Sequence, residues 1–393
     1  MLKVLYQSRY DCCGCTACYS VCPVNAIRMT SDDEGFQYPV IDQDICVNCK
    51  KCESVCPLKT NIGNSDPINI YAAKNKQEAD RASSSSGGIF SLLANYTQLK
   101  GGVIYGAAFD ERFIVRHMRA EDVGEWKKFC VSKYTQSDMG YTFQSVKADL
   151  SKGKFVLFSG TPCQVDGLNR YLQNARVSCE RLITCDIVCH GTPSPQIWKD
   201  YLNYLSRINK CGIGSISFRN KESSGWHNST LTIKNEKGQT ILSETHKENF
   251  YFQLFVCHYI LRPSCFKCKY ASFHRPGDFT LGDFWGIDKN FAPFDDNKGV
   301  SLVMVHTDKG QKIWREIQNG ADFFSVTKEQ CVQPNLVEPS KENPDLESFW
   351  DWYKRYGLLR IGQRMGYLPA GKMEKLLLFL YRVENKLRCF VKK

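Results

Sequence analysis

Two closely similar cysteine runs within the first 60 residues constrain this 393-residue chain more than any other feature. Residues 12–23 and 46–57 both read C-x2-C-x2-C-x3-C followed by proline. Three thiolates on a tight turn can bind three irons of one cube, and the fourth ligand must then come from elsewhere in the chain. The spacing therefore predicts two 4Fe–4S clusters.

The ligands of each cluster follow from the ferredoxin pattern, in which the fourth cysteine of each run crosses to the other cluster. The first cluster is predicted to bind Cys12, Cys15, Cys18 and Cys56. The second cluster is predicted to bind Cys22, Cys46, Cys49 and Cys52. Cys13 is a spare thiol, because only Cys12 has the two-residue spacing to Cys15. Isolated C-x2-C pairs would also fit zinc or disulfides, but this double pattern favours iron–sulfur clusters.

Composition limits the class of protein. The chain contains 20 cysteines but no apparent secretory leader, so a reducing cytoplasm is the expected location. No apolar run reaches the roughly 18 residues of a membrane span. The formal charge is +11, and two clusters of about −2 each would lower it to about +7. No arginine-rich, aromatic-interleaved run predicts nucleic-acid binding. Anionic small molecules, a flavin nucleotide or an acidic electron carrier are the expected partners.

Periodicity predicts an α+β and α/β multidomain chain. Strands are expected at 68–73, 102–109, 155–158, 182–188 and 300–305, and helices at 89–96, 138–152, 163–172, 197–208 and 250–260. This alternation favours an α/β core with a largely parallel sheet. Period-2 segments at 216–218, 230–233 and 241–243 predict an antiparallel β insertion. The expected segments are a double-cluster ferredoxin domain at 1–62, core segments at 67–152 and 153–340, and a helical tail at 341–393.

The last 22 residues, 372–393, have apolar side chains on one side of an expected helix and Lys or Arg opposite. Such a helix either docks on the protein or lies on an anionic membrane surface as a peripheral contact. Both interpretations stay open from the sequence.

A Ser/Gly segment, residues 83–88, precedes the expected helix at 89–96. Backbone N–H groups at a helix N-terminus, together with serine hydroxyls, form a ready anion site for a phosphate. Ser/Gly runs also occur as flexible loops, so this motif alone is weak.

Four further cysteines follow strands or lie in loops, and they can converge: Cys163, Cys189, Cys265 and Cys268. A third 4Fe–4S cluster and a structural zinc ion both need four such thiolates. Unrelated buried cysteines are the third interpretation, since free cysteine is often buried. A nucleophilic Cys163 paired with His190 is also possible, although no third orienting group is evident.

The order of the motifs carries a family resemblance. After the double cysteine run come SSSSGG, SKYTQS, GTPCQ, CHGTPS, RPSCFKCKY and DFTLGDFWG. Over roughly residues 1–310 the chain resembles the coenzyme F420 hydrogenase/dehydrogenase beta-subunit family. The resemblance implies an iron–sulfur flavoprotein that passes electrons between clusters, FAD and a substrate such as the F420 deazaflavin.

The resemblance also implies site residues. Cys163, Cys189, Cys265 and Cys268 would bind a third 4Fe–4S cluster near the flavin, with Cys185 as a substitute ligand. The implied flavin residues are Ser85, Ser86, Gly87, Gly88, Lys133, Tyr134, Gln136, Gly160, Thr161, Gln164, Asp283 and Trp285.

Three residues are candidates for the chemistry itself. Lys133 is available for a phosphate or the flavin ring, and His190 or His227 would supply a proton to the substrate. His227 lies in the segment 218–228, where Arg219 and Lys221 offer cations for an anion. A polar hairpin loop with a packed tryptophan is an equally good interpretation of that segment.

The resulting hypothesis is a redox enzyme in which a flavin links single-electron flow to two-electron chemistry. Its expected partners are ferredoxin or another low-potential electron donor or acceptor, and a small-molecule substrate. The alternative is a non-catalytic electron-transfer subunit of a larger complex. A zinc-stabilised binding module with an appended ferredoxin is the third interpretation.

Overall fold

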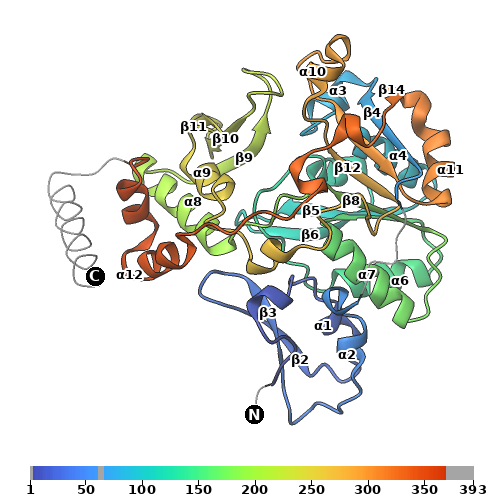
Figure 1. Cartoon of the computed structure of the whole chain (residues 1–393), viewed down its shortest axis with the longest axis horizontal. Helices are drawn as coiled ribbons and strands as arrows, with labels where there is room; N and C mark the ends of the chain where they lie inside the picture. The colour runs from blue at the N-terminus through green and yellow to red at the C-terminus, as the bar shows by residue number, and fades with distance from the viewer. Residues whose placement is uncertain (1–2, 61–65, 369–393) are drawn as a thin grey trace.

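The computed structural model describes residues 3–60 and 66–368. The predicted basic helix at 372–393 lies outside these residues. The N-terminal domain consists of a small antiparallel sheet and short helices (Figure 1). Its elements are β1 (Lys3–Val4), η1 (Arg9–Asp11), α1 (Ala17–Val21), β2 (Ile27–Ser31), β3 (Gln37–Ile41), α2 (Lys51–Ser54) and η2 (Pro57–Lys59), with strand order β1-β3-β2.

The two cysteine runs have the same backbone conformation. Thr16 and Lys50 precede α1 and α2 with positive φ values of 68° and 58°. Cys22 and Cys56 follow the same two helices in extended conformation, with φ values of −67° and −71°. The sequence repeat is therefore also a structural repeat.

The core is built on one eight-stranded sheet. Across the sheet the strands are β14 (Ala321–Ser325), β4 (Asn69–Asn75), β13 (Ser301–Val305), β12 (Phe279–Asp283), β8 (Leu182–Ile187), β7 (Val156–Gly160), β5 (Val103–Phe109) and β6 (Val115–Ala120). The predicted strands are present within two residues of their expected bounds. The segments 67–152 and 153–340 contribute to the same sheet.

The prediction of a largely parallel sheet is wrong, because the sheet is mixed. Only the central strands β5, β7, β8 and β12 run parallel to their neighbours in that series. The strands β6, β13, β4 and β14 are paired antiparallel. A strand buried along its whole length, such as β13, carries no signal for its direction, since burial on both faces removes the alternation that identifies an antiparallel surface strand.

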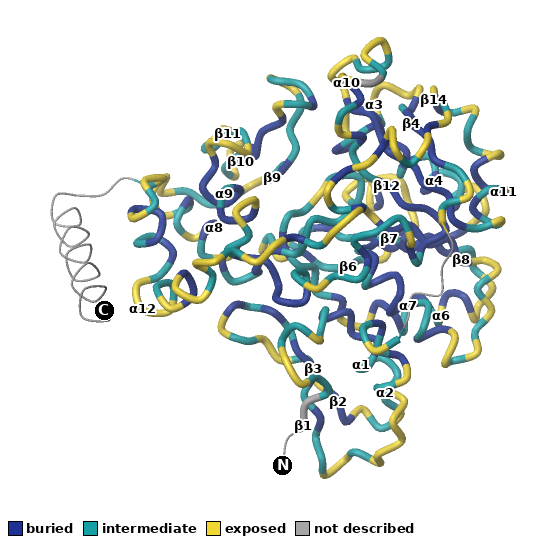
Figure 2. Tube along the Cα trace, in the orientation of Figure 1, coloured by how far each residue is buried: buried dark blue, intermediate teal, exposed yellow. Residues whose placement is uncertain are grey.

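Helices cover both faces of this sheet. On one face α4 (Ile89–Leu99) and α11 (Asp308–Ile317) pack on Leu157 and Ile183. On the other face α6 (Thr142–Ser151) and α7 (Pro162–Asn174) pack on Val156 and Phe158. The ferredoxin domain joins this second core through Cys15, Ala17 and Val55. Figure 2 shows the strands of the large sheet mostly buried, while exposed residues gather at the outer loops.

A third lobe contains the predicted antiparallel insertion, which is confirmed. Its strands β9 (Ile213–Asn220), β10 (Thr230–Asn235) and β11 (Thr240–Thr245) pair in the order β11-β10-β9. They pack with α8 (Pro195–Asn209), α9 (Phe250–Val256) and α12 (Leu346–Arg364) around a core rich in aromatic residues (Figure 1). Within the described residues, none of the helices combines the length and apolarity needed to span a bilayer.

Two predicted helices are shorter than expected. The helix predicted at 138–152 begins only at Thr142, because Asp138 instead pairs with Arg116 beside β6. The helix predicted at 250–260 ends at Val256, and His258 beyond it adopts a left-handed conformation with φ of 63°. Positive φ in a non-glycine residue does not continue a right-handed helix.

Candidate functional site

The four cysteines predicted for the first cluster line one cavity in the ferredoxin domain: Cys12, Cys15, Cys18 and Cys56. Burial raises the pKa of the Cys18 thiol well above its ordinary value, and the nearby Cys12 and Cys56 raise it further. Four thiols around one cavity would repel one another as thiolates, so a cationic group bound between them would stabilise the ionised form.

The second predicted set is arranged around the neighbouring loop. Cys52 contributes to the wall of the same cavity. The sulfur of Cys22 accepts a hydrogen bond of 3.2 Å from the backbone N–H of Ala26. Cys49 is exposed and Cys46 is half-buried, on the segment that leads into α2.

The structure brings the other four predicted cysteines together. Cys163 at the start of α7, Cys189 after β8, and Cys265 and Cys268 on η4 (Pro263–Lys267) and its end line one cavity. Burial raises the pKa of the Cys189 thiol well above its ordinary value, and Cys265, Cys163 and Cys268 raise it further. The prediction that these four loops converge agrees with this geometry.

The donor spacing bears on the zinc interpretation. Within residues 3–60 and 66–368, no three His, Cys, Asp or Glu side chains lie close enough together to hold one metal ion. A zinc ion needs all its thiolates at about 2.3 Å from itself. A 4Fe–4S cube places a separate iron behind each thiolate and therefore accepts sulfurs that lie further apart.

Cys13 lies between the two cysteine-lined cavities and contributes to the walls of both. The neighbouring Cys15 thiol and burial raise the pKa of the Cys13 thiol well above its ordinary value, while the Cys163 thiol lowers it. The hydroxyl of Thr161 lies 3.2 Å from the Cys163 sulfur. The backbone N–H of Thr192 donates to the Cys265 sulfur over 3.4 Å. Cysteines of the ferredoxin domain and of the core therefore line one cavity.

A much larger cavity of about 650 Å³ lies between the eight-stranded sheet and the three-stranded lobe. Its volume falls within the range of roughly 300–1,000 Å³ that is typical of ligand sites, which often occur between domains. The predicted site residues that line it are Ser85, Ser86, Gly88, Lys133, Tyr134, Gly160, Thr161, Gln164, His190, His227, Asp283 and Trp285. Cys185, the predicted substitute ligand, also lines it.

Two predicted flavin residues are absent from this wall. Gln136 points toward the ferredoxin domain, where its side-chain amide donates to the carbonyl of Cys13 over 3.1 Å. The neighbouring Thr135 and Ser137 line the cavity instead, so Gln136 turns away from the cavity toward the ferredoxin domain. Gly87 lies behind the wall, where its N–H donates to the Ser301 hydroxyl over 3.0 Å.

The Ser/Gly segment is held in place at the N-terminus of α4. The N–H of Ser132 donates to the Ser85 hydroxyl over 2.7 Å. Gly88 precedes α4 with a positive φ of 80°, and no side chain caps the helix. Gly88, Ile89 and Phe90 line the large cavity. The unpaired backbone N–H groups at the N-terminus of this three-turn helix therefore lie at the cavity wall, which is the arrangement that an anion site requires.

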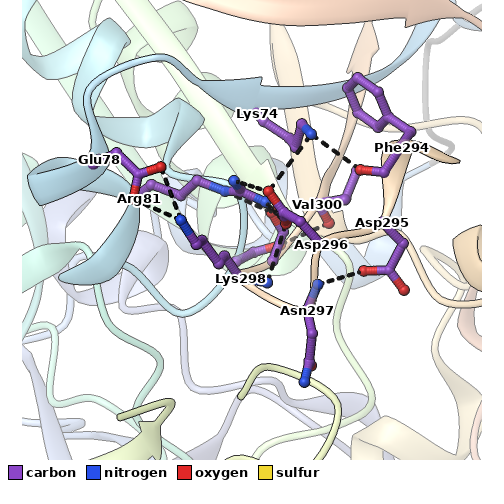
Figure 3. A network of polar contacts seen from close by, with 12 residues as sticks. Lys74, Glu78, Arg81, Phe294, Asp295, Asp296, Asn297, Lys298 and Val300 are labelled. Carbon is purple, nitrogen blue, oxygen red and sulfur yellow. Dashed lines mark hydrogen bonds and ion pairs between the residues drawn. The ribbon is translucent and has the colours of Figure 1, made fainter.

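A charged network joins the residues just before this segment to the loop at 294–300 (Figure 3). Both Arg81 and Lys74 point toward the Asp296 carboxylate, with Nη1 of Arg81 at 2.7 Å and Nζ of Lys74 at 3.7 Å. Lys221 donates from its Nζ to the carbonyls of Arg81 and Ser86 at 2.8 Å and 3.2 Å. Lys221 was a candidate anion ligand, and the structure gives it carbonyl partners instead.

Gly87→Ala is expected to destabilise the protein. A Cβ at this position would lie 2.5 Å from the carbonyl oxygen of Ala73 and 2.6 Å from the N of Ser301. Both contacts are backbone atoms of the sheet, so the loop must shift, at a typical overpacking cost of about 1–3 kcal/mol. Thermal unfolding measures this loss. Gly124→Ala, on the short helix α5 (Val123–Trp126) without backbone contacts to clash with, is the control and should unfold at or above the wild-type temperature.

Lys133 is the titratable cation of the large cavity. Its ammonium donates to the carbonyl of Lys128, and it lies in the cavity wall. Burial lowers the pKa of Lys133 to about 7. An anion bound beside it would therefore meet a lysine that takes up a proton near neutral pH.

Arg219 and Trp285 line another part of the cavity wall, and the buried Trp226 packs behind them. The Nη1 of Arg219 donates to the Asp283 carboxylate over 2.9 Å, and the indole N–H of Trp226 donates to the same group over 3.0 Å. Trp285 stacks on Trp226 with ring centroids 5.0 Å apart, and it remains 43% exposed. The Nη2 of Arg219 is buried without a hydrogen-bond partner in the described chain. This unpaired donor fits a bound polar group.

The two candidate histidines have different surroundings. His227 Nε2 lies 2.6 Å from the Asp295 carboxylate. His190 borders both the four-cysteine cavity and the large cavity. Its Nε2 lies 2.9 Å from Nε2 of His258, a residue that the sequence did not single out. Sequence reasoning also missed Arg262, whose only signal is its position directly before the Pro263-Ser-Cys265 motif.

Cysteine-lined cavities in series, beside one large ligand-sized cavity, define an electron-transfer protein of the iron–sulfur type. Residues 11–60 match the 4Fe-4S dicluster domain. Residues 153–328 match the family described as the C terminus of the beta subunit of coenzyme F420 hydrogenase/dehydrogenase. The resemblance predicted from the sequence is confirmed over these two segments.

One solved structure matches most of the chain at low identity. A chain of "Xenon derivatization of the F420-reducing [NiFe] hydrogenase complex from Methanosarcina barkeri" is 17% identical, with a TM-score of 0.48. The match covers 75% of this chain and 90% of that chain. None of the curated proteins compared with the chain matches it.

Proposed function

We propose that the chain is an iron–sulfur flavoprotein oxidoreductase in which electrons pass between the two clusters of the ferredoxin domain, a third cluster and FAD. The observation that carries this proposal is the sharing of cavity walls. Cys13 contributes to the first two cavities. The four-cysteine cavity and the large cavity share the wall residues Thr161, Cys189, His190, Gly191, Thr192 and Asn335. Cofactors bound in these cavities would be neighbours, as electron transfer between them requires.

FAD fits the large cavity by the chemistry of its walls. The free N-terminus of α4 and Lys133 would hold a phosphate. The apolar residues Phe90, Leu281 and Trp285 would face the rings, and the unpaired Nη2 of Arg219 would meet a polar atom. When bound, FAD supplies the junction between single-electron transfer and two-electron chemistry.

The chain's own groups would manage the proton that accompanies substrate reduction. His227 lines the large cavity, and its Nε2 faces the buried carboxylate of Asp295. That carboxylate fixes the orientation of the imidazole through the contact with Nε2. His190 lies at the boundary with the four-cysteine cavity, so it is the second candidate proton donor. A deazaflavin of the F420 type or another small organic molecule would be the substrate.

Cofactor content tests this proposal directly. Protein reconstituted anaerobically should contain about twelve irons, as three 4Fe–4S clusters require, and one FAD per chain. Candidate substrates are then added to the reduced protein while the flavin absorbance is followed. A chain with about eight irons, bound zinc and no flavin would contradict the proposal.

The second candidate function is an electron-transfer subunit without its own substrate turnover. It is favoured by the matched family, which is described as part of a beta subunit. Purification of the native protein separates the two functions. A protein that reduces a substrate alone is an enzyme, whereas one that turns over only with a co-purified hydrogenase or dehydrogenase subunit is a relay.

A further inference from the structure

One fully buried arginine lies where the ferredoxin domain meets the four-cysteine cavity. Arg262 has 0% exposure and lines the four-cysteine cavity. It directly precedes η4, which carries Cys265, and η4 packs against η1 beside Cys12. A hypothetical Cβ on Gly14 would lie 2.9 Å from Nη1 of Arg262. The guanidinium therefore lies against the backbone of the first cysteine run.

Its hydrogen bonds are directed mainly at the ferredoxin domain. Nε donates to the carbonyl of Cys12 over 2.7 Å, and Nη2 donates to the carbonyl of Gln37 over 2.9 Å. Nη2 also lies 3.6 Å from the Cys12 sulfur. On the core side, Nη1 donates to the side-chain oxygen of Gln136 over 2.9 Å. The guanidinium carbon stacks 4.2 Å from the centre of the Tyr38 ring.

The charge of Arg262 has no carboxylate partner among the ion pairs of the described residues. Arg275, the other buried arginine of the same cavity wall, pairs with the Asp186 carboxylate at 3.1 Å. A buried cation is unstable unless a counter-charge compensates it. The anionic candidates closest to Arg262 are Cys12, Cys13, Cys265 and the phenol of Tyr38.

We propose that Arg262 is the buried counter-charge of the cluster bound by Cys12, and that it raises the reduction potential of this cluster. The inference rests on the proposed cluster at Cys12, Cys15, Cys18 and Cys56. Hydrogen bonds to cluster sulfurs and the local net charge set such potentials. Reduction adds one negative charge to the cluster, so a cation held 3.6 Å from a ligand sulfur stabilises the reduced form more than the oxidised form. Arg262 thus acts on electron transfer toward the core through the reduction potential of this cluster and not by contacting a substrate.

Arg262→Gln removes the charge and keeps a hydrogen-bonding side chain. Anaerobic redox titration of the iron-loaded protein, followed by EPR, gives the potential of each cluster. Cys49→Ser identifies the other ferredoxin cluster. In Arg262→Gln, the one-electron reduction constant of the Cys12 cluster should fall at least about tenfold, which is about 59 mV for one electron. Arg9→Gln is the matched control, because Arg9 contacts Tyr38 but is neutralised by Asp32 and Glu34. It should leave this constant within about threefold of wild type.

The remaining outcomes are equally informative. An Arg262→Gln protein that holds wild-type iron and titrates at the wild-type potential overturns the inference. If the Arg262→Gln protein does not bind iron, the Arg262→Lys protein is examined next. Wild-type iron content in Arg262→Lys shows that the positive charge is required, whereas loss of iron in both variants overturns the inference. The iron content of the wild-type protein tests the proposed clusters separately, so the failure of one proposal is distinguishable from the failure of the other.

Discussion

Cys265→Ser is expected to bind about eight irons instead of about twelve, because one of three 4Fe–4S clusters loses a thiolate. A low-potential donor should still reduce the remaining two clusters. Reduction of the flavin through these clusters should slow to the rate at which the same donor reduces the flavin in protein that lacks the ferredoxin clusters. The physical reason is the position of the four-cysteine cavity between the other two cavities. Iron analysis and stopped-flow absorbance measure the two effects.

Two matched cysteine variants control this experiment. Cys211→Ser changes a half-buried cysteine on the turn after α8, outside all three cavity walls. It should keep both the iron content and the flavin reduction rate. Cys13→Ser should also keep about twelve irons, since Cys13 is predicted to be a spare thiol. Full iron content in Cys265→Ser would show that this cysteine is not a ligand.

Lys133→Met is expected to weaken FAD binding by roughly 10- to 100-fold. Hydrogen bonds to charged groups contribute about 1.5–3 kcal/mol, and each factor of ten corresponds to about 1.4 kcal/mol. The methionine keeps the length and the apolar stem of the side chain, so the cavity wall should stay filled. Equilibrium titration of flavin-free protein with FAD measures the change. An unchanged affinity would place the phosphate elsewhere.

The same lysine should make FAD affinity depend on pH. Burial lowers the pKa of Lys133 to about 7 in the free protein, and a bound phosphate would raise it. Binding then takes up a proton. Affinity should be nearly constant below pH 7 and should fall above it by up to about tenfold per pH unit until the pKa of the complex is reached. Lys133→Met should abolish this slope. Lys152→Met, at the end of α6 and away from the cavities, should retain it.

Local spacing explains why the ferredoxin domain was predictable. Each cysteine run supplies its ligands within eleven residues, so the spacing alone specifies the backbone turn that the structure shows around Thr16 and Lys50. The convergence of Cys163, Cys189 and the Cys265–Cys268 pair is different, because the chain separates them widely. It was expected from the order of motifs, and the strands that end before Cys163 and Cys189 bring those loops together.

Tertiary contacts account for what the sequence did not reveal. The direction of the buried strands β4 and β13 depends on their neighbours, so the parallel sheet was a wrong prediction. The orientation of Gln136 depends on its hydrogen bonds to Cys13 and Arg262, which lie in distant parts of the chain. The partners of Arg262, namely Cys12, Gln37 and Gln136, come from three distant parts of the chain. An arginine beside a cysteine pair indicates nothing specific until those parts are assembled.

The walls of the four-cysteine cavity make its accessibility a measure of domain docking. Cys13 and Leu58 of the ferredoxin domain form one side of that cavity. The docked domain covers this side, and undocking would open it. We therefore expect the four irons of the inner cluster to resist chelators longer while the domain stays docked. Their resistance to chelation would then report on docking as well as on ligand strength.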